Sequence, residues 1–316
     1  MELIRGSDAI RGALLRPVLT VGNFDGLHRG HQAILDTVVG RARTLAGRAV
    51  VYTFDPHPRK VLQPERAPGL LTTLEQKLEL LEAAGADVVI VETFTRDFAR
   101  TPPEVFIRDV LHARIRPIEV YVGYDFHFGR DRQGSMRLLT EMGPHLGFAV
   151  TIIPEVSLDE GDVNSTRIRQ LLADGRTEQA RAMLGRDFSV RGRVREGERR
   201  GRGLGFPTAN LDPENEVLPG PGVYAGRARL LDEGDPPAGS SWPAVTNVGR
   251  RPTFERDGLL AAEAHLIGFD GDLYGRRLEL SFRHRLRPER RFPDAEALRK
   301  QIAADVAEAR RRLESV

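Results

Sequence analysis

The chain contains no cysteine and few aromatic residues, and each absence excludes a class of chemistry. Without cysteine there is no disulfide bridge, no thiolate ligand for a metal and no cysteine nucleophile. Phe, Trp and Tyr make up 6% of the chain, which leaves few platforms for stacking RNA bases. Positive and negative side chains nearly cancel at a net charge of +2, so we expect no nucleic-acid partner.

Long apolar runs are absent as well. No segment approaches the length that spans a membrane, and the first residues, Met-Glu-Leu-Ile-Arg, lack the pattern of a signal peptide. Hydrophobic residues make up 40% of the 316 residues and charged residues 29%, which is typical of globular proteins and sufficient for two domains. We expect a cytoplasmic protein that has no membrane partner and is a monomer or a weak homo-oligomer.

The first 184 residues alternate strand-like and helix-like segments. The expected strands are residues 18–22, 49–54, 87–91, 118–122 and 148–153. Residues 74–84 are the clearest helix, because Thr73 and Gln76 are spaced as a capping box and Gly85 provides a stop. The alternation predicts a Rossmann-like parallel sheet with helices on both faces and ligands at the carboxyl ends of its strands.

After Gly185 the pattern becomes all-β, with turn-rich segments between short strands. Strands are expected at residues 189–195, 223–230, 244–248, 261–267 and 277–285, as an antiparallel barrel or a sandwich. A long helix follows Pro293, and its apolar stripe consists of Leu298, Ile302, Val306, Ala309 and Leu313. We expect an α/β domain over residues 1–184 and a β domain over residues 185–316.

Two histidines lie where the first of these strands turns into a helix. Gly22, Gly26 and Gly30 permit a sharp turn there, and the free amides at a helix start favour a phosphate. His28 and His31, three residues apart, face the same side of the first helical turn and can stabilise charge on a transferring phosphoryl group. A metal site is not indicated, because no third ligand is evident nearby.

A second phosphate candidate begins at Asn164, which is a good helix N-cap. Ser165, Thr166 and the first-turn amides can bind phosphate oxygens, and Arg167 and Arg169 can add charge-assisted hydrogen bonds. An ordinary capped helix with exposed arginines explains the segment equally well. Together with the histidine pair it resembles the nucleotidyltransferase superfamily, in which an HxGH motif and a later Ser-Thr-Arg loop hold ATP.

Five further residues of the first domain, in three segments, have two interpretations each. Asp125 follows the fourth expected strand and either helps to hold Mg²⁺ or makes a loop hydrogen bond. Asp25 either supports the site from behind or forms a turn. Phe54, Asp55 and His57 either line an acceptor pocket or belong to a rigid turn built by the two neighbouring prolines.

The glycine-rich segment 201–211 is the strongest signal of the second domain. Its glycines permit close approach of phosphates to the backbone, and Arg202 supplies charge. Thr208 and Asn210 place two oxygens on residues two apart, which suits Mg²⁺; the alternative is a plain turn between strands. Strand alternation puts Glu263 and His265 on one face, where Glu263 is either a general base for a hydroxyl or a solvent-facing acid.

These motifs resemble, in order and over nearly the whole chain, the bacterial bifunctional riboflavin kinase/FMN adenylyltransferase family, also called FAD synthetases. The segments that carry the resemblance are residues 22–31, 53–58, 122–129, 165–169, 184–186, 204–210, 247–250, 263–265 and 286–289. The resemblance implies that a C-terminal barrel phosphorylates riboflavin with ATP to give FMN. The N-terminal domain would then join FMN to the α-phosphate of ATP, giving FAD and pyrophosphate, with Mg²⁺ as the metal.

The resemblance also implies roles for individual residues. Glu263, His28 and His31 would be catalytic, and the metal would be held by Thr208, Asn210 and Asp125. ATP and its phosphates would be bound by Gly22, Phe24, Asp25, Gly30, Ser165, Thr166, Arg167, Arg169, Arg202, Gly203, Gly205 and Pro207. The flavin would be bound by Phe54, Asp55, His57, Asn247 and Arg250. One departure is Asn164, where the family commonly has a serine; its capping ability favours an unchanged geometry.

Two other functions compete with this interpretation. One is an adenylyltransferase that acts on another small phosphate ester and uses its barrel only for binding, which the presence of Thr208, Asn210 and Glu263 disfavours. The other is a nucleotide-sensing or RNA-binding regulator, which predicts salt-dependent nucleic-acid binding and no ATP turnover.

Overall fold

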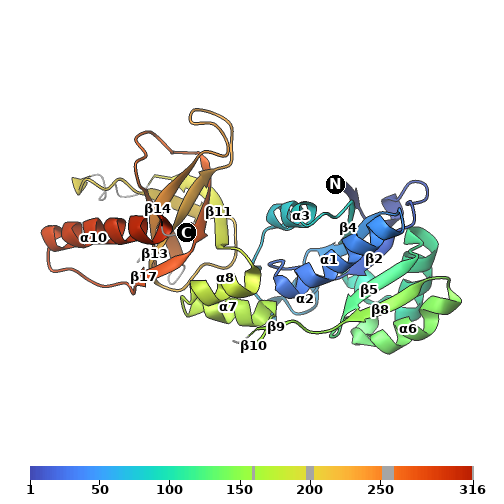
Figure 1. Ribbon diagram of the computed structural model, residues 1–316. Coiled ribbons are helices and arrows are strands. Elements are labelled where there is room, and N and C mark those ends of the chain that lie inside the picture. Colours follow the sequence, from blue (N-terminus) through green and yellow to red (C-terminus); the bar gives the residue numbers. More distant parts are fainter. Residues whose placement is uncertain (159–160, 197–202, 251–259, 315–316) are drawn as a thin grey trace. The chain divides into compact units, whose positions relative to one another are not determined.

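The computed structural model describes residues 1–158, 161–196, 203–250 and 260–314. By its internal contacts the chain divides into unit 1, Met1–Asn164, and unit 2, Ser165–Val316 (Figure 1). The packing therefore groups residues 165–184 with the second unit, whereas the sequence places the functional boundary after residue 184. That functional boundary stays a prediction.

Unit 1 is built on a parallel sheet of six strands in the order β1-β4-β3-β2-β5-β8. Its strands are β1 (Glu2–Arg5), β2 (Val18–Val21), β3 (Ala49–Asp55), β4 (Val88–Thr93), β5 (Glu119–Gly123) and β8 (Ala149–Ile153). The parallel sheet and its five expected strands are confirmed, with shifts of a residue or two at the ends. The sequence did not indicate β1, because this short edge strand is mostly exposed and carries no apolar run.

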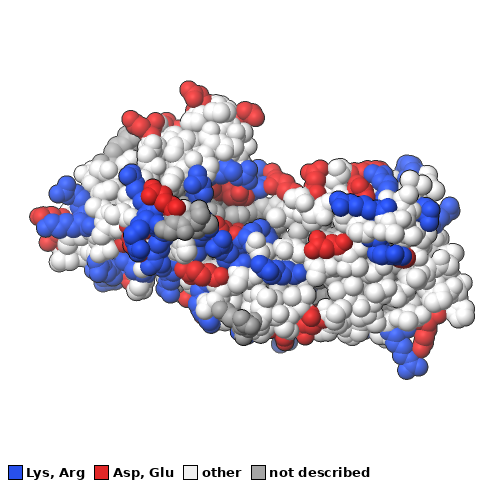
Figure 2. All heavy atoms as spheres, in the orientation of Figure 1, with Lys and Arg blue, Asp and Glu red and all other residues white. Residues whose placement is uncertain are grey.

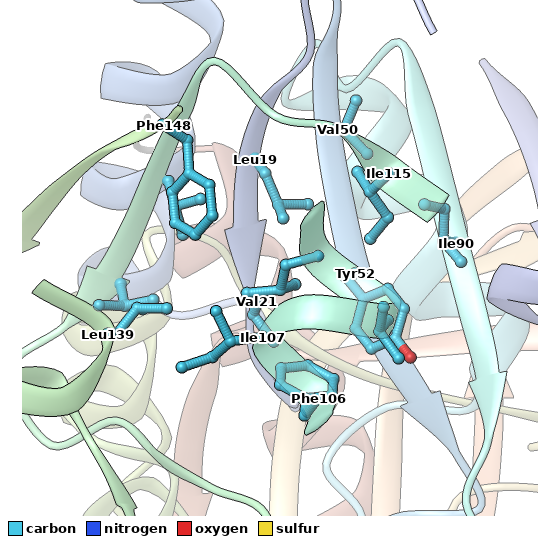
Figure 3. Packing of buried hydrophobic residues seen from close by; sticks show 14 of the residues in the cluster. Leu19, Val21, Val50, Tyr52, Ile90, Phe106, Ile107, Ile115, Leu139 and Phe148 are labelled. Carbon is cyan, nitrogen blue, oxygen red and sulfur yellow. The ribbon is translucent and has the colours of Figure 1, made fainter. Parts of the chain in front are cut away.

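Helices cover both faces of this sheet, as expected. Helices α1 (Arg29–Thr44) and α3 (Leu74–Ala83) contribute Leu35 and Leu81 to one side of the core. The capping box of Thr73 and Gln76 is present at the start of α3. The opposite side is covered by the π-helical segment η3 (Phe106–Ile115) and by α6 (Met136–His145), and Figure 3 shows their apolar side chains directed at the strand residues of the sheet.

Short elements complete unit 1. They are η1 (Ser7–Ala9), α2 (Pro58–Leu62), η2 (Pro64–Arg66), α4 (Arg96–Ala99), α5 (Pro103–Val105), η4 (Arg130–Arg132) and two antiparallel pairs, β6 (His127–Phe128) with β7 (Gly134–Ser135) and β9 (Ser157–Leu158) with β10 (Gly161–Asp162). Several of them lie in the connections that follow β3, β4 and β5, so they shape the carboxyl edge of the sheet.

Unit 2 begins with α7 (Ser165–Ala173) and α8 (Thr177–Leu184), which precede an antiparallel barrel. The barrel strands are β11 (Phe188–Arg195), β12 (Ala209–Pro213), β13 (Gly222–Leu230), β14 (Ser241–Arg250), β15 (Leu260–Leu266) and β16 (Arg277–Phe282). Pairing runs β14-β15-β12-β11-β16-β13, and β13 pairs back with β14. This closure makes the fold a barrel, which decides between the two all-β forms that the sequence allowed.

Two strands of the barrel differ from expectation. Strand β12 was not predicted, because its five residues directly follow a glycine- and proline-containing loop. The strand expected at residues 277–285 is divided into β16 and β17 (His284–Arg287), and both pair with β13. The break falls at Arg283, whose backbone N–H donates to the carbonyl of Ala225 at 2.9 Å.

The final helix, α10 (Ala295–Glu314), packs on the outside of the barrel against β13 and β14 (Figure 1). Val306, Ala309 and Leu313 of the expected stripe meet Val223 and Val245. Asp305 is also buried on this helix, and its Oδ2 accepts hydrogen bonds from Nε and Nη2 of Arg287 at 3.0 and 2.9 Å. This ion pair fastens α10 to β17.

Candidate active sites

The first candidate site lies at the carboxyl edge of the parallel sheet in unit 1. There β2 pairs with β3 on one side and with β5 on the other. The order of the strands along the chain reverses between β2 and β5, and ligands of doubly wound sheets bind beyond the strand ends at such a switch point. The connections after these three strands carry His28, His57 and Asp125, which lie far apart in the sequence.

His28 and His31 form a stacked pair at the start of α1. His28 is the N-cap residue, and its Nδ1 accepts a hydrogen bond from the backbone N–H of His31 at 3.4 Å. Their ring centroids are 3.7 Å apart with an angle of 18° between the planes. Both imidazoles thus lie at a helix N-terminus, where amides and the helix dipole favour an anion. This arrangement suits stabilisation of a transferring phosphate.

The glycines of this turn allow close packing. A Cβ at Gly30 would lie 3.2 Å from the His28 ring, so the missing side chain leaves room for the imidazole. Gly22 lies just after β2, and a Cβ there would lie 3.1 Å from the ring of Phe24. Phe24 is itself 1% exposed, and it packs against His31 with centroids 5.1 Å apart. Phe24 therefore supports the histidine pair from the core side.

Asp25 fastens the same turn to the segment before α3. Its carboxylate accepts hydrogen bonds from the backbone N–H groups of Leu71 at 3.0 Å and Thr72 at 3.3 Å. The backbone N–H of Gly26 donates to the Thr72 hydroxyl at 3.3 Å. The carboxylate is 4% exposed, and these bonds agree with the role of a turn former that supports the site from behind.

The end of β3 and the connection after it carry the expected flavin-binding residues of unit 1. Phe54 is half-buried, and its ring packs edge-on against Phe94 with centroids 5.6 Å apart. Asp55 is the last residue of β3, and His57 is the N-cap of α2, where its Nδ1 accepts from the Arg59 N–H at 3.1 Å. Asp125 is exposed after β5, and its carbonyl lies 2.8 Å from Nδ1 of His127.

Lys77 is a residue of this edge that sequence reasoning missed. It lies on α3, it is 8% exposed, and its ammonium is 3.4 Å from the carbonyl oxygen of Phe54. Burial lowers the pKa of Lys77, while the carboxylates of Asp25 and Asp55 oppose that shift. The sequence does contain a signal that Lys77 is buried. Position 77 follows Leu74 by three residues and so falls on the apolar face of the expected helix.

The expected Ser-Thr-Arg phosphate loop lies at the start of α7, in unit 2. Asn164 directly precedes the helix, and Ile168, Leu171 and Leu172 are buried as the apolar spacing predicts. Ser165 and Arg169 are half-buried, whereas Thr166 and Arg167 are exposed. The helix start thus presents hydroxyl and guanidinium groups toward the surface.

The second candidate site is a row of polar side chains across three neighbouring barrel strands. The register aligns Asn210 on β12 with Glu263 on β15, and Glu263 with Asn247 on β14. Directly paired residues of antiparallel strands point to the same face. The alternate residues Ala262 and Ala264 are fully buried in the barrel, so the polar row lies on the outer face.

The loop before β12 adjoins this row. Thr208 lies two residues before Asn210 and is half-buried. Gly203 and Gly205 are exposed, and no described atom lies within 4 Å of a Cβ built at either, which leaves room for a ligand beside the backbone. Arg202 lies outside the described residues, and only the backbone of Arg250 is described, at the end of β14.

His265 holds this loop against the strand. Its Nδ1 lies 2.9 Å from the carbonyl oxygen of Pro207, which requires a proton on Nδ1 as the donor. The ring also packs edge-on against Phe206 with centroids 5.4 Å apart. Because Pro207 directly precedes Thr208, this contact positions the loop that carries Thr208. The alternation of the strand correctly predicted that His265 and Glu263 share one face, but the sequence gave no sign of the contact with Pro207.

Charged side chains are distributed over both units, and Figure 2 shows basic and acidic groups interspersed on the face that it presents. In unit 2 the carboxylate of Glu279 receives hydrogen bonds from Arg191 at 2.8 Å and from Arg229 at 2.8 Å. Burial by itself would raise the pKa of Glu279, but the two guanidinium groups outweigh it and hold the pKa below 4.5. Glu279 is therefore ionised at neutral pH.

Comparison with known proteins assigns each part of the chain to a family. The family described as FAD synthetase matches residues 13–167, and the family described as riboflavin kinase matches residues 184–313. The first match includes Ser165, Thr166 and Arg167. The two matches therefore contain, respectively, the histidine pair with the Ser-Thr-Arg loop and the polar row of the barrel.

Two sequence relatives that match nearly the whole chain share one description. A bifunctional riboflavin kinase/FMN adenylyltransferase of Pseudomonas fluorescens is 40% identical, covering 98% of this chain and 97% of the relative. The protein of the same description from Escherichia coli K12 is 39% identical with the same coverage. A solved structure from Streptococcus pneumoniae, described as a macrolide-efflux protein, superimposes with a TM-score of 0.87 at 26% identity, covering 98% and 99% of the two chains.

The efflux description of that neighbour differs from the descriptions of the sequence relatives, and the likeness concerns the shared fold. In the part of this chain that the structure describes, no helix combines the length and apolar character needed to cross a membrane.

Proposed function

The chain belongs to the bifunctional riboflavin kinase/FMN adenylyltransferase family, and from that premise we propose how its two sites divide the synthesis of FAD. The protein phosphorylates riboflavin to FMN and then adenylylates FMN to FAD, with release of pyrophosphate. The observation that carries the assignment of sites is the register of β12, β15 and β14, which aligns Asn210, Glu263 and Asn247 in one row. The functional boundary is proposed at residues 184 and 185, where the riboflavin kinase match begins.

In the kinase reaction, Glu263 orients the terminal ribityl hydroxyl of riboflavin and accepts its proton as the oxygen attacks the γ-phosphate of ATP. The bond between the γ-phosphorus and the β-phosphate oxygen breaks, and ADP leaves. A half-buried carboxylate flanked by two amide side chains is held in place for this task. Asn247 and Arg250 are proposed to contact the flavin. Arg202, Gly203, Gly205 and Pro207 bind the phosphates, and the open space beside the two glycines supports this role.

The oxygens near Glu263 fit a bound Mg²⁺. Thr208, in the loop just before β12, and Asn210, within β12, offer two neutral oxygen ligands two residues apart. Among the described residues no three His, Asp or Glu side chains come together as ligands, so the ATP phosphates would complete the coordination. When bound, the cation would neutralise negative charge that develops on the phosphates. On the adenylylation side, the exposed carboxylate of Asp125 is the proposed ligand.

In the adenylylation reaction, a phosphate oxygen of FMN attacks the α-phosphate of ATP and pyrophosphate leaves. His28 and His31 stabilise the charge on the α-phosphate, since their stacked rings are fixed by the helix cap and by Phe24. Gly22, Gly30 and the surrounding amides bind phosphate oxygens, and Asp25 shapes the turn. Ser165, Thr166, Arg167 and Arg169 are proposed to hold the triphosphate.

The acceptor FMN is proposed to bind at the connection after β3. Phe54 offers an apolar surface backed by Phe94 and Phe98, which suits a flat ring system. Asp55 and His57 flank it with polar groups. We also propose a cytoplasmic location, because both reactions consume ATP, and a monomeric or weakly oligomeric state.

The test is chromatography of the products from purified protein with riboflavin, ATP and Mg²⁺. The expected result is FMN followed by FAD. FMN as the sole product would mean that the adenylylation site has another acceptor or is inactive. No product from riboflavin or from added FMN would overturn the proposed function.

A further inference from the structure

The chain makes sparing use of lysine. Of its 47 Lys and Arg residues only three are lysines, Lys60, Lys77 and Lys300. Lys77 is the buried one of the three, with 8% of its surface exposed. A buried cation is costly unless it is paired and hydrogen-bonded, and a lysine kept inside an arginine-rich chain indicates a place that suits a compact ammonium rather than a planar guanidinium.

The surroundings of Lys77 belong to both connections that form the adenylylation site. Its Nζ lies 3.4 Å from the Phe54 carbonyl oxygen at the end of β3. The carboxylates whose charge acts on it are Asp55, also at the end of β3, and Asp25, in the turn after β2. Asp25 in turn binds the backbone of Leu71 and Thr72, just before the helix that carries Lys77.

Helix α3 is itself held firmly at this end. The Thr73 hydroxyl accepts from the Gln76 N–H at 3.2 Å, and the Gln76 side chain accepts from the Thr73 N–H at 3.0 Å. The backbone N–H of Lys77 donates to the Thr73 carbonyl at 3.0 Å. The base of the lysine side chain is therefore fixed, and its ammonium extends from α3 to within 3.4 Å of the Phe54 carbonyl oxygen.

We infer that Lys77 is a positioning residue for adenylylation. Its ammonium joins α3 to the backbone at Phe54 and so fixes the flavin-binding connection after β3 relative to the histidine turn after β2, which Asp25 ties to the segment before α3. This inference rests on the proposed function of that site. A small displacement of a substrate-positioning segment lowers the rate strongly, because the reacting atoms must meet in one geometry.

The first test replaces Lys77 by methionine, which keeps the unbranched side chain as far as its fourth atom and removes the terminal ammonium. We expect kcat/KM for FMN adenylylation to fall about 100-fold, chiefly through a raised KM for FMN, while the KM for ATP in this reaction changes less than about twofold. The riboflavin kinase activity of the same protein should stay unchanged and reports that the chain is folded. Lys300→Met, whose side chain is exposed on α10, is the matched control and should leave both activities unchanged.

The second test uses the absence of cysteine. In the Lys77→Cys variant the introduced thiol is unique, so alkylation with 2-bromoethylamine restores a side chain of lysine length with an ammonium, whereas iodoacetamide adds a neutral group. We expect the first reagent to recover at least about half of the lost kcat/KM for FMN and the second to recover none. Intact mass verifies complete alkylation, and kinase activity verifies the fold.

The outcomes separate the inference from the proposed function. If the unaltered protein makes no FAD from FMN and ATP, the proposed function fails. If it does make FAD, the inference is overturned when Lys77→Met stays within about threefold of the unaltered protein, or when the amine-bearing and the neutral alkylated proteins have equal adenylylation activity.

Discussion

The two units assemble their candidate sites in opposite ways. In unit 1 the parallel sheet brings together residues from connections, so His28, His57 and Asp125 follow the carboxyl ends of β2, β3 and β5. In unit 2 the antiparallel barrel aligns residues within strands, so Asn210, Glu263 and Asn247 lie side by side through backbone pairing. In the parallel sheet the site residues come from the loops that follow the strands, whereas in the antiparallel barrel they come from neighbouring strands at paired positions.

This difference affects how each site is supported. The histidine pair depends on side-chain contacts, namely a helix cap, a stacked ring and the carboxylate of Asp25. The polar row depends on ladder hydrogen bonds, and the side chain of His265 braces the loop beside it. We therefore expect substitutions to separate the two activities cleanly, with the unaffected reaction as an internal control.

The largest expected effect is that of Glu263→Gln on the kinase reaction. The amide keeps the size of the side chain and cannot accept the hydroxyl proton, so the rate of FMN formation should fall about 10²- to 10⁴-fold. FAD formation from added FMN should be unchanged, as measured by product chromatography. Equal loss of both activities in a folded variant would contradict the division of labour between the two units.

The next effect is that of the histidine pair. His28→Ala should lower FAD formation about 10²- to 10³-fold and spare FMN formation. His28→Asn is the matched variant, because asparagine also caps helices while alanine costs about 1 kcal/mol of helix stability. Steady-state kinetics and thermal melting of both variants distinguish the roles: if the asparagine variant regained full activity, the histidine would act only as a cap.

A third prediction concerns the stability of the barrel. In Glu279→Gln the side chain of Arg191, 3% exposed, loses its buried counter-charge, and the free energy of unfolding should fall by about 3 kcal/mol. Because the folded pKa of Glu279 is depressed, its contribution is present above pH 4.5 and is lost as the pH falls through the folded pKa. Urea unfolding at a series of pH values should show this acid loss in the unaltered protein and a smaller one in the variant.

The smallest expected effect is that of His265→Ala. Loss of one hydrogen bond to Pro207 frees the loop that carries Thr208, and a bond of this kind contributes about 1 kcal/mol. The KM for ATP in the kinase reaction should rise about fivefold, with adenylylation unchanged. A variant that loses kcat and keeps its KM for ATP would show that His265 acts on the chemical step instead.

Much of the fold was predictable because its signals are local. The structure contains three features that depend on neighbours in the sequence. They are the apolar strands, the capping box at Thr73 and the apolar stripe of the last helix around Val306. Strands β1 and β12 were missed, since one is exposed at an edge and the other is short and follows a loop. Barrel closure could not be predicted, because the pairings of β11 with β16 and of β12 with β15 join segments far apart in the chain, and no local pattern encodes them.

The sequence alone determined the family resemblance, the two-part organisation and the motif residues, since these depend on residue identity and order. Only the tertiary structure decided which of those residues support each other: Asp25 binds Leu71 and Thr72, His265 holds Pro207, and Lys77 reaches Phe54. The physical reason is that such contacts join segments far apart in the chain, and their energies depend on burial and distance, which exist only after the sheet and the barrel have formed.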